Sequence, residues 1–476
     1  MPTLKQDLIL LETRGLLRVT LENEKPVVRF KHALTREATY NSILQTRRAE
    51  LHHTVAQTLS QIYPQPDLEL VLTIAEHWQR GGDDARALET ILPLAQSLVY
   101  TGRSLSLTAL LSRLNRARLN PEQQRNLDLT MADAFSARGE YHDARELYQR
   151  ALTIADEPSV RIRILQGLGV CNYHLGNFAR AIEYYQASLR AAEEIQDVVQ
   201  QARATGGMGA AYVNSGEYER AMKYLEQSRA LSIQAGRELE LANAEGNMAL
   251  ALYYQGEYAQ AIQAAQRALE IDERLGHTTL AARTLPLIGY CYYSLGDLQR
   301  AEEYYRRAYE SSHALGDTWG EATELSNLAE LYAERGELER AAATYQQSIP
   351  LLRHVKHEVG IAFSLTGLAE IQFKQAQQSK NSAQSTSWMN NALTNVQEAL
   401  ALAQQSSLRE REGAALRVLA EIQAAQGDFE MARATAERAV HALEQAGQSI
   451  ERRRAYRTYG QLLAKSSDPN QQASSA

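Results

Sequence analysis

Glycine recurs through much of this chain at an almost constant spacing. The glycines are Gly139, Gly176, Gly216, Gly256, Gly296 and Gly336, separated by 37, 40, 40, 40 and 40 residues. One further step of 40 residues reaches Ala376, and the next glycine of this kind, Gly427, follows 51 residues later. Such a period is the mark of a stacked repeat array, in which each unit contacts mainly its neighbours.

The last step exceeds the period by 11 residues, which indicates an insertion. Sixteen residues separate Ala376 from Ala392, whereas five separate the glycine from its alanine in the other repeats. The segment from Gln375 to Ser387 is rich in Gln and Ser. We expect it to form a mobile polar loop.

Each repeat predicts two helices. In the first, Leu285, Ile288 and Tyr292 follow helical spacing, and the periodic glycine then supplies the left-handed residue that ends the helix. Small residues recur in the first helix at Gly169, Gly209, Ala249, Gly289, Ala329 and Ala420, and in the second at Ala181, Ala221, Ala261, Ala301, Ala341 and Ala432. These small residues allow the two helices to approach closely. Only ten of the 476 residues are prolines, so few positions would interrupt a helix. The sequence predicts an all-α chain.

One repeat resembles the tetratricopeptide repeat closely. Its residues are Ile288-Gly289-Tyr290-Cys291-Tyr292, then Ala301, Tyr305 and Ala308, against W-x2-L-G-x2-Y…A-x3-F…P over 34 residues. The present repeats depart from the family by using about 40 residues and by lacking the closing proline.

The resemblance covers residues 125–465, with about eight repeats and a closing helix from Ser449 to Lys465. It implies a right-handed α-solenoid, a superhelix of helical hairpins with a concave groove.

The N-terminal part follows another pattern. Leu17, Val19 and Leu21 alternate with polar residues, a polar turn spans residues 23–26, and alternation resumes after it. This predicts a β-hairpin. Two helices follow, and residues 75–88 look like one degenerate repeat.

This order of elements resembles the region after the nucleotide-binding core of STAND-class signalling ATPases, where a winged helix leads into a repeat arm. The matching residues are Phe30, His32, Leu34, Glu37, Arg48, Leu51, His52 and His77. The phosphate-binding Gly-x-x-x-x-Gly-Lys-Ser/Thr motif of such cores does not occur in the sequence. We therefore expect residues 1–60 to be a winged-helix-like remnant, 61–124 a helical linker with a degenerate repeat, 125–465 the superhelix, and 466–476 a disordered tail.

Composition narrows the function classes. Fifty basic and 57 acidic residues give a net charge of −7, which argues against nucleic acid as a partner. The chain has no apolar run long enough for a membrane span, no signal peptide and only two cysteines, so we expect a cytoplasmic protein with free thiols.

Motifs for catalysis or metal binding are also missing. His32, His52, His53 and His77 lack the spacing of a zinc site, and no hydrolase or kinase signature occurs. We expect no enzyme activity, no cofactor and no metal. Arg452, Arg453, Arg454 and Arg457 favour a solvated cap surface over an anion site.

The family resemblance also implies which first-helix positions face the groove. Transferred register by register, the partner-binding residues are Arg163, Gln166, Tyr173, Arg203, Asn247, Tyr253, Tyr254, Arg283, Tyr290, Tyr293, Asn327, Glu330, Glu334 and Glu370. The set is aromatic and basic in its first half and acidic in its second half, and Tyr and Arg are enriched at binding hot spots. The alternative is that the tyrosines pack between helices and the charges solvate a face.

The leading hypothesis is a non-catalytic interaction scaffold that holds a protein or peptide in its groove. The alternative is a ligand-sensing arm of a signalling ATPase or transcription regulator, whose nucleotide-binding module is absent from this chain and could be its partner.

Overall fold

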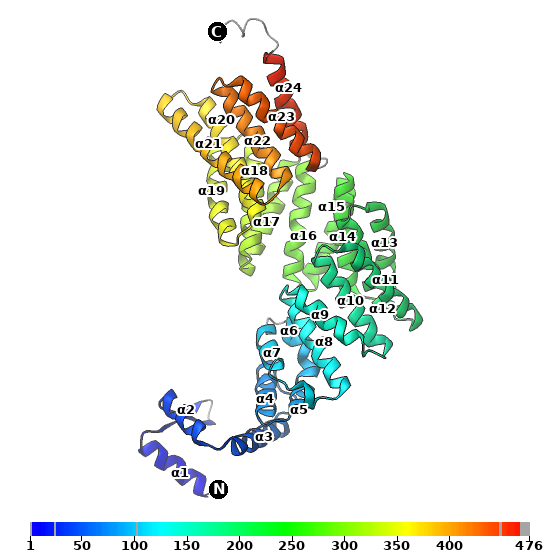
Figure 1. The fold of residues 1–476 in the computed structure, drawn as a ribbon, viewed down its shortest axis with the longest axis vertical. Coiled ribbons are helices and arrows are strands. Elements are labelled where there is room, and N and C mark those ends of the chain that lie inside the picture. The colour runs from blue at the N-terminus through cyan, green and yellow to red at the C-terminus, as the bar shows by residue number, and fades with distance from the viewer. Residues whose placement is uncertain (1, 23–24, 101–102, 447–449, 467–476) are drawn as a thin grey trace. The chain divides into compact units, whose positions relative to one another are not determined.

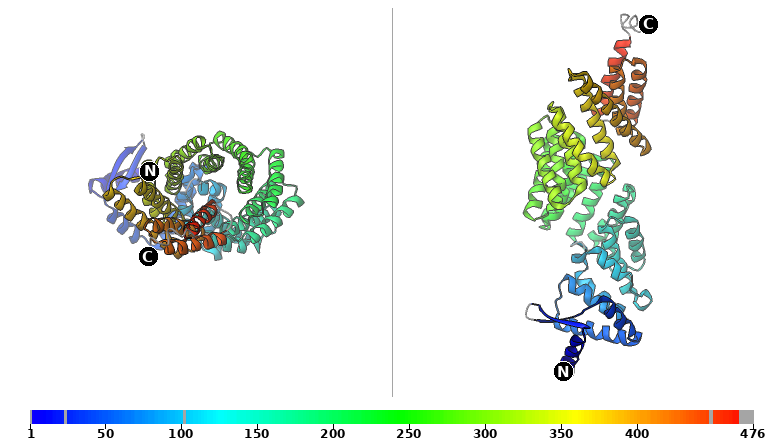
Figure 2. Two further views of the ribbon diagram at one scale, coloured as in Figure 1. Left: turned by 90° about the horizontal axis from the view of Figure 1, so that it is seen from above. Right: turned by 90° about the vertical axis from the view of Figure 1, so that its left-hand side faces the viewer.

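The chain is built almost wholly of tandem helices (Figure 1). The computed structural model describes residues 2–22, 25–100, 103–446 and 450–466. By its internal packing the chain divides into two units, residues 1–215 and residues 216–476, which are described in turn. Within each unit, successive hairpins lie side by side (Figure 2). The predicted all-α solenoid with a small β-hairpin is confirmed.

Unit 1 combines the hairpin with the first repeats. Its elements are α1 (Pro2–Thr13), β1 (Leu17–Glu22), β2 (Lys25–Phe30), α2 (Ala33–Ser42), α3 (Gln45–Ile62), α4 (Leu68–Arg80), α5 (Asp84–Ile91), η1 (Leu92–Leu94), α6 (Ala95–Tyr100), α7 (Ser104–Leu111), η2 (Arg116–Arg118), α8 (Pro121–Ala137), α9 (Tyr141–Leu152), α10 (Pro158–His174), α11 (Phe178–Glu194) and α12 (Val198–Asn214).

The β-hairpin is antiparallel, with Leu17 opposite Phe30 and Val19 opposite Val28. The predicted strands are confirmed, although β2 begins at Lys25, inside the predicted turn. Asn23 and Glu24 of that turn lie outside the described residues. The winged-helix resemblance and the predicted domain boundaries stay predictions.

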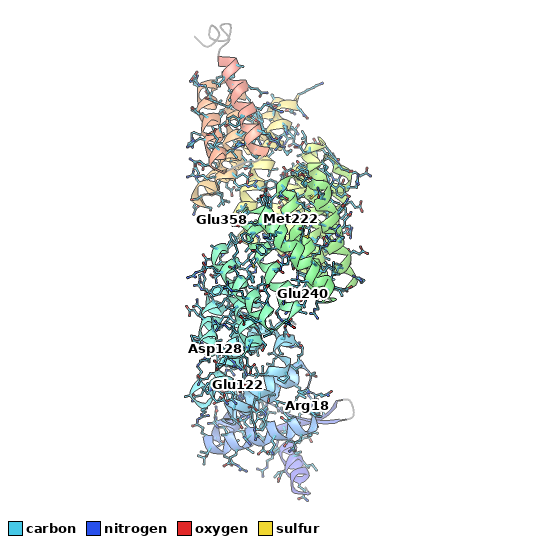
Figure 3. All side chains as sticks on the ribbon, turned by 90° about the vertical axis from the view of Figure 1, so that its right-hand side faces the viewer. Arg18, Glu122, Asp128, Met222, Glu240 and Glu358 are labelled. Carbon is cyan, nitrogen blue, oxygen red and sulfur yellow. The ribbon has the colours of Figure 1, made fainter. Side chains whose placement is uncertain are left out.

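A buried carboxylate joins the first repeat of unit 1 to the segment before it. Asp128 lies on α8 together with Glu122 (Figure 3) and is fully buried. It accepts hydrogen bonds from Arg116 of η2 at 2.8 Å and from Arg150 of α9 at 2.9 Å. Two guanidinium groups therefore compensate one buried charge. Asn120 and Gln123 form a capping box that starts α8.

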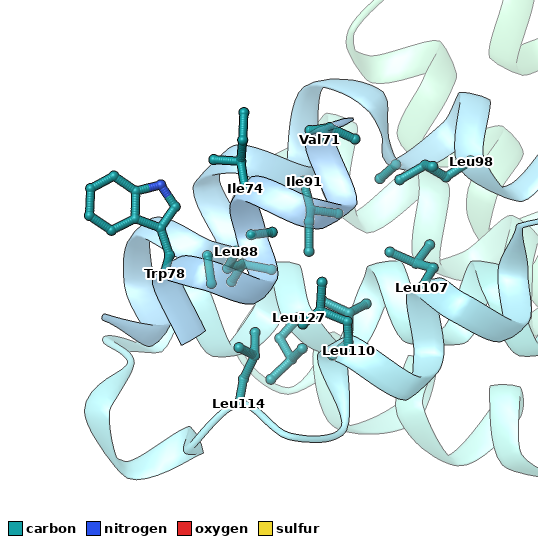
Figure 4. Packing of buried hydrophobic residues seen from close by; sticks show 14 of the residues in the cluster. Val71, Ile74, Trp78, Leu88, Ile91, Leu98, Leu107, Leu110, Leu114 and Leu127 are labelled. Atoms are coloured by element: carbon teal, nitrogen blue, oxygen red, sulfur yellow. The ribbon is translucent and has the colours of Figure 1, made fainter. Parts of the chain in front are cut away.

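The degenerate repeat is a helical hairpin whose core is shared with the helices that follow it. Gly82, at φ +81°, ends α4, and the Asp83 side chain caps α5 by accepting from the Arg86 amide. Figure 4 shows the buried side chains that close this core, among them Ile74, Trp78, Leu88, Ile91, Leu107 and Leu127.

Unit 2 continues the repeats. Its helices are α13 (Tyr218–Gln234), α14 (Glu238–Gln255), α15 (Tyr258–Arg274), α16 (Thr278–Ser294), α17 (Leu298–Leu315), α18 (Thr318–Glu334), α19 (Leu338–His354), α20 (Glu358–Gln378), α21 (Ser382–Gln405), α22 (Arg409–Ala425), α23 (Phe429–Ala446) and α24 (Ile450–Ser466). Ser449, where the closing helix was predicted to begin, and residues 467–476 of the predicted tail lie outside the described residues.

The glycines end helices as predicted. Gly256, Gly296 and Gly336 have φ between +77° and +82°, in the left-handed region that glycine adopts at least cost. At the end of the second helix, three repeats place other residues in this conformation, Gln196 in unit 1 and Lys356 and Ser407 in unit 2, all with positive φ.

Two of the predicted small residues of the first helix, Gly169 and Gly289, sit under buried tyrosines of the second. A Cβ added to Gly289 would lie 2.6 Å from the buried Tyr305 ring, and one added to Gly367 would lie 2.4 Å from Tyr345. Such distances are shorter than any real carbon contact, so only glycine fits beneath these rings. The predicted packing role of these positions is confirmed.

The predicted mobile loop is wrong. Residues 375–387 extend α20 and α21, and only residues 379–381 separate the two helices. Gln375 and Ala376 are buried, the Ser385 hydroxyl donates to the Ala376 carbonyl at 2.7 Å, and the Asn381 side chain caps α21. Ser and Gln are compatible with helix once tertiary contacts hold them.

The two cysteines behave as predicted. Cys171 and Cys291 are free and buried, and burial raises the pKa of each thiol to about 12. They are inert packed residues.

Candidate functional site

Five helices of unit 2 surround a pocket of about 580 Å³ of empty space, part of it open to solvent. We call it the Glu330 pocket. Its lining residues are Glu330, Ala333 and Glu334 of α18, Tyr345 of α19, Phe363, Thr366, Gly367, Glu370, Ile371 and Lys374 of α20, Arg411, Ala414 and Arg417 of α22, and Glu451 and Arg454 of α24. The predicted residues Glu330, Glu334 and Glu370 thus meet in one place.

Arg417 is the buried centre of the charges in this pocket. Only 5% of its side chain is exposed, and its guanidinium donates to Glu370 at 2.7 Å, Glu451 at 3.0 Å and Glu421 at 3.3 Å. Lys374 lies 2.8 Å from Glu370. Burial alone would raise the pKa of Glu370, but the charges of Arg417 and Lys374 outweigh burial and lower this pKa to about 2. Glu370 is therefore ionised, and its charge is already compensated by cations of the same chain.

Arg454 connects the closing helix to α18. Its guanidinium donates to Glu334 at 2.6 Å and to Glu451 at 2.8 Å. One third of its side chain remains exposed. The expectation of a merely solvated patch is therefore wrong for Arg454, because an ion pair to a residue 120 positions away draws it inward.

Glu330 lacks such compensation. It is half-buried, and it makes no hydrogen bond or ion pair with the described residues. Burial raises its pKa to about 7, while the charge of Arg454 acts in the opposite direction. The carboxylate also contributes to raising the pKa of the phenols of Tyr253, Tyr290 and Tyr293, which places these rings within electrostatic range of it.

Three of the predicted tyrosines, Tyr253, Tyr254 and Tyr290, form a row of ring contacts together with Tyr218, which we call the tyrosine row. Tyr218 stacks on Tyr254 at a centroid distance of 5.6 Å, Tyr254 meets Tyr253 at 5.5 Å, and Tyr253 meets Tyr290 at 6.4 Å. Tyr254 is 55% exposed, whereas burial raises the pKa of Tyr253 to about 12 and raises that of Tyr290 as well. Tyr290 also contacts the buried Tyr305 ring at 5.5 Å. The row therefore combines one exposed ring, Tyr254, with embedded ones.

The two predicted amides differ in their surroundings. Asn327 is buried; it donates to Glu324 at 3.0 Å and accepts from the Tyr290 hydroxyl at 3.2 Å, so both ends of its amide are engaged. Asn247 donates to the Asn243 carbonyl at 2.8 Å, one turn earlier in the same helix.

Arg283 and the predicted residues of unit 1 lie on first helices. Arg283 is exposed on α16 and has no ion-pair partner within the described part of the chain. In unit 1, Arg163 pairs with Asp133, Gln166 donates to the Gln200 carbonyl at 3.3 Å, and Arg203 is exposed.

Tyr173, also in unit 1, accepts a hydrogen bond from Asn214 at 2.9 Å. The role of all fourteen predicted residues in binding stays a prediction.

Sequence reasoning did not place the basic residues of the pocket there: it did not single out Lys374, Arg411 or Arg417, and it assigned Arg454 to a solvated surface. For Arg417 a signal existed. The equivalent positions of earlier repeats are Gly246, Pro286, Ser326 and Thr366. An arginine where other repeats have small or uncharged residues indicates a special interaction.

The N-terminal segment, residues 2–63, has little core of its own. Helix α2 has no buried residue, and α3 buries only Ala56 within the described structure. Leu34, Leu44 and Ile62 are 80%, 77% and 60% exposed. These three apolar side chains are therefore left largely uncovered by the described residues.

The predicted histidine cluster is only partly a cluster. The His52 and His77 Nδ1 atoms lie 2.8 Å apart, and the Tyr40 hydroxyl lies 2.8 Å from the His52 Nε2. Burial lowers the pKa of both imidazoles. Over the described residues, no three His, Cys, Asp or Glu side chains are grouped to hold a metal, and no helix is long and apolar enough to cross a membrane.

Comparisons with known proteins agree with the repeat architecture. A tetratricopeptide repeat model matches residues 123–194, 160–234 and 240–314, and a second model of this repeat matches residues 324–354. None of the curated protein sequences compared with the chain matches it.

Solved structures share the fold at low identity. A STAND protein with a tetratricopeptide repeat sensor from Pyrococcus horikoshii is 16% identical, with a TM-score of 0.57 over 86% of this chain. The match covers 60% of that protein's length. The apo quorum sensor NprR from B. thuringiensis is 14% identical (TM-score 0.54, 75% of this chain, 99% of that one), and apo RapI is 13% identical (0.52, 76% and 99%). The repeats of this chain belong to the tetratricopeptide repeat family, and their architecture is that of a protein-interaction scaffold.

Proposed function

We propose that unit 2 binds a peptide or helix of a partner protein along the tyrosine row, without catalysing a reaction. The observation that carries this proposal is the exposed Tyr254 ring, which other rings of the tyrosine row contact on two sides. Rigid tyrosines bury a large area at low entropic cost, and the exposed Arg283 offers a cation to acidic groups of the partner.

The embedded members of the row prepare the exposed one for binding. Tyr253 and Tyr218 hold Tyr254 by ring contacts on two sides, so little side-chain freedom is left to lose. Tyr290 supports Tyr253 from the interior of the repeat. The quorum sensor NprR shares this fold, which supports a sensing role for such an array but does not identify the ligand.

The test is a selection of random peptides against the wild-type chain, followed by binding to variants. Tyr254→Ala should weaken the selected peptides by about 2 kcal/mol or more, the scale of a hot spot, while the free energy of unfolding changes little. Tyr456→Ala is the matched control, because this tyrosine of the same unit is 47% exposed but lies outside the row. Peptides that bind the Tyr254 variant as tightly as the wild type would reject the tyrosine row as the site.

A second candidate function rests on a different surface. The exposed Leu34 and Leu44 of the N-terminal segment favour an arm that packs against a nucleotide-binding module of another chain. The chain covers 60% of the STAND structure, so an ATPase of that kind has a further part to which such a segment could attach.

Capture from native lysate with the wild type and with a Leu34→Asp, Leu44→Asp double variant tests this candidate. The wild type should retain a protein with a phosphate-binding motif, identified by mass spectrometry, and the double variant should lose it. The candidate is discarded if the wild type retains no such protein, or if the double variant retains it equally.

A further inference from the structure

The Glu330 pocket holds two carboxylates, Glu330 and Glu334, that share a single ion-pairing cation among the described residues. Glu334 has Arg454 as its one ion-pair partner within the described structure, and Glu330 has none. The other cations of the pocket are engaged elsewhere: Arg417 and Lys374 with Glu370, and Arg411 with Glu410. Direct pairing of these two carboxylates therefore depends on one guanidinium, while the charge of Arg411 also acts on Glu330.

That guanidinium comes from the last helix of the chain. Arg454 donates one nitrogen to Glu334 at 2.6 Å and another to Glu451 at 2.8 Å, the two-sided geometry that a planar guanidinium suits. One third of the Arg454 side chain is exposed, so an outside group can reach the same carboxylates. An ion pair of this exposure contributes only modestly to stability and is readily exchanged.

The walls of the pocket also suit a guanidinium. Tyr345 and Phe363 line it, and the Arg411 guanidinium already lies 5.2 Å from the centre of the Phe363 ring. Arginine stacks on aromatic faces and binds carboxylates with two parallel hydrogen bonds, which the compact lysine ammonium cannot do. An anionic ligand would leave Glu330 and Glu334 without compensation.

We propose that the Glu330 pocket is a subsite for one arginine side chain of a partner, and that Arg454 occupies this subsite until the partner's arginine displaces it. The inference rests on the proposed function, because it supplies an anchor for one end of a peptide bound in unit 2. The intramolecular arginine then acts as a competitor. It lowers the apparent affinity by the fraction of time that the subsite is filled.

The experiment uses the full chain and the pentapeptide Ala-Ala-Arg-Ala-Ala, followed by NMR titration of the peptide signals. The same peptide with citrulline in place of arginine is the neutral control. The wild type should bind the arginine peptide weakly, and Arg454→Ala should bind it about three- to tenfold more tightly, because the competitor is gone. Arg453→Ala is the matched control, since this neighbouring arginine of α24 is exposed and does not line the pocket. It should leave the affinity unchanged.

Two further variants guard the interpretation. Arg454→Ala could disturb the packing of α24, so Arg454→Met, which keeps an apolar side chain of similar length, is tested beside it. It should show the same gain in affinity for the arginine peptide. Glu334→Gln in the Arg454→Met background should remove most of the gain, because the carboxylate that receives the guanidinium is lost.

Three outcomes would overturn the proposal. The first is equal affinity for the arginine and citrulline peptides, and the second is no gain of affinity in either Arg454 variant. The third is binding by the variants but not by the wild type, because the substitution would then have created a cavity that the native protein lacks. The result is separable from the tyrosine row, because Tyr254→Ala should leave pentapeptide binding intact. If the pentapeptide test fails but the selected peptides still depend on Tyr254, only the arginine subsite is rejected, and the proposed function stands.

Discussion

Replacing Arg417 by Ala should destabilise the C-terminal end of unit 2 strongly. The guanidinium is 5% exposed and joins carboxylates of α20, α22 and α24, so its loss leaves Glu370 and Glu451 in a poorly hydrated pocket with too few cations. Removing one partner of a buried ion pair costs about 3–5 kcal/mol.

The pKa of Glu370 gives a second, independent value for this loss of stability. Its ordinary value is 4.5 and the folded value is about 2. At about 1.4 kcal/mol for each pH unit, this difference corresponds to about 3 kcal/mol of stability. A lowered carboxyl pKa stabilises the fold fully above the unfolded value, and this contribution is lost as the pH falls from about 4.5 towards 2. The difference between wild type and Arg417→Ala should therefore be largest near neutral pH and shrink in acid.

Urea unfolding followed by circular dichroism at pH 7 and pH 3 measures the effect. Hydrogen exchange should locate it in α20–α24, because repeats contact mainly their neighbours. Arg411→Ala is the matched control: this arginine also lines the pocket but pairs with Glu410 on its own helix at 3.2 Å, so about 1 kcal/mol or less should be lost. A loss below 1 kcal/mol for Arg417→Ala at pH 7, or one that is equal at pH 3, would refute the reasoning.

Three other substitutions test the fold and the pocket. Lys356→Gly should raise the free energy of unfolding by about 0.5–1 kcal/mol, since Lys356 has a φ of 54° where the preceding repeat has Gly316; a loss in urea unfolding would contradict this. Gly289→Ala should cost about 1–2 kcal/mol by forcing a methyl group against Tyr305, partly offset by the better helix propensity of alanine, and a stability gain in thermal unfolding would disprove the close contact. Glu330→Gln should become more stable than wild type as the pH rises from 5 to 8, by about 1–3 kcal/mol. The pKa of Glu330 is raised from its ordinary value of 4.5 to about 7 in the folded chain, so its ionisation disfavours the fold. A stability difference that does not depend on pH would count against this argument.

Much of the fold could be predicted from local pattern. The glycines end helices where the 40-residue period places them, because left-handed backbone is a property of single residues. The pairing of a small residue on one helix with a tyrosine on the next, as at Gly289 and Tyr305, follows from the same period. The polar insertion after Gln375 was predicted wrongly, because composition alone does not show that Gln375 and Ala376 would be buried.

Three acidic residues of the candidate site were named from the sequence, but the basic residues of the pocket and the state of its charges were not. Transferring the register of a repeat family brought Glu330, Glu334 and Glu370 together, and the pocket contains all three. It could not show that Glu370 is neutralised by Arg417, or that Tyr290 is embedded while Tyr254 is exposed.

The sequence by itself therefore determined the repeat, the helix ends and the packing positions, because each depends on residues within one or two repeats of one another. The tertiary structure alone decided which charges are paired. Arg454 and Glu334 are 120 residues apart, and no spacing along the chain relates them. They meet because the stacked repeats of unit 2 bring α24 against α18, and the partner of a half-buried charge is set by distance in space.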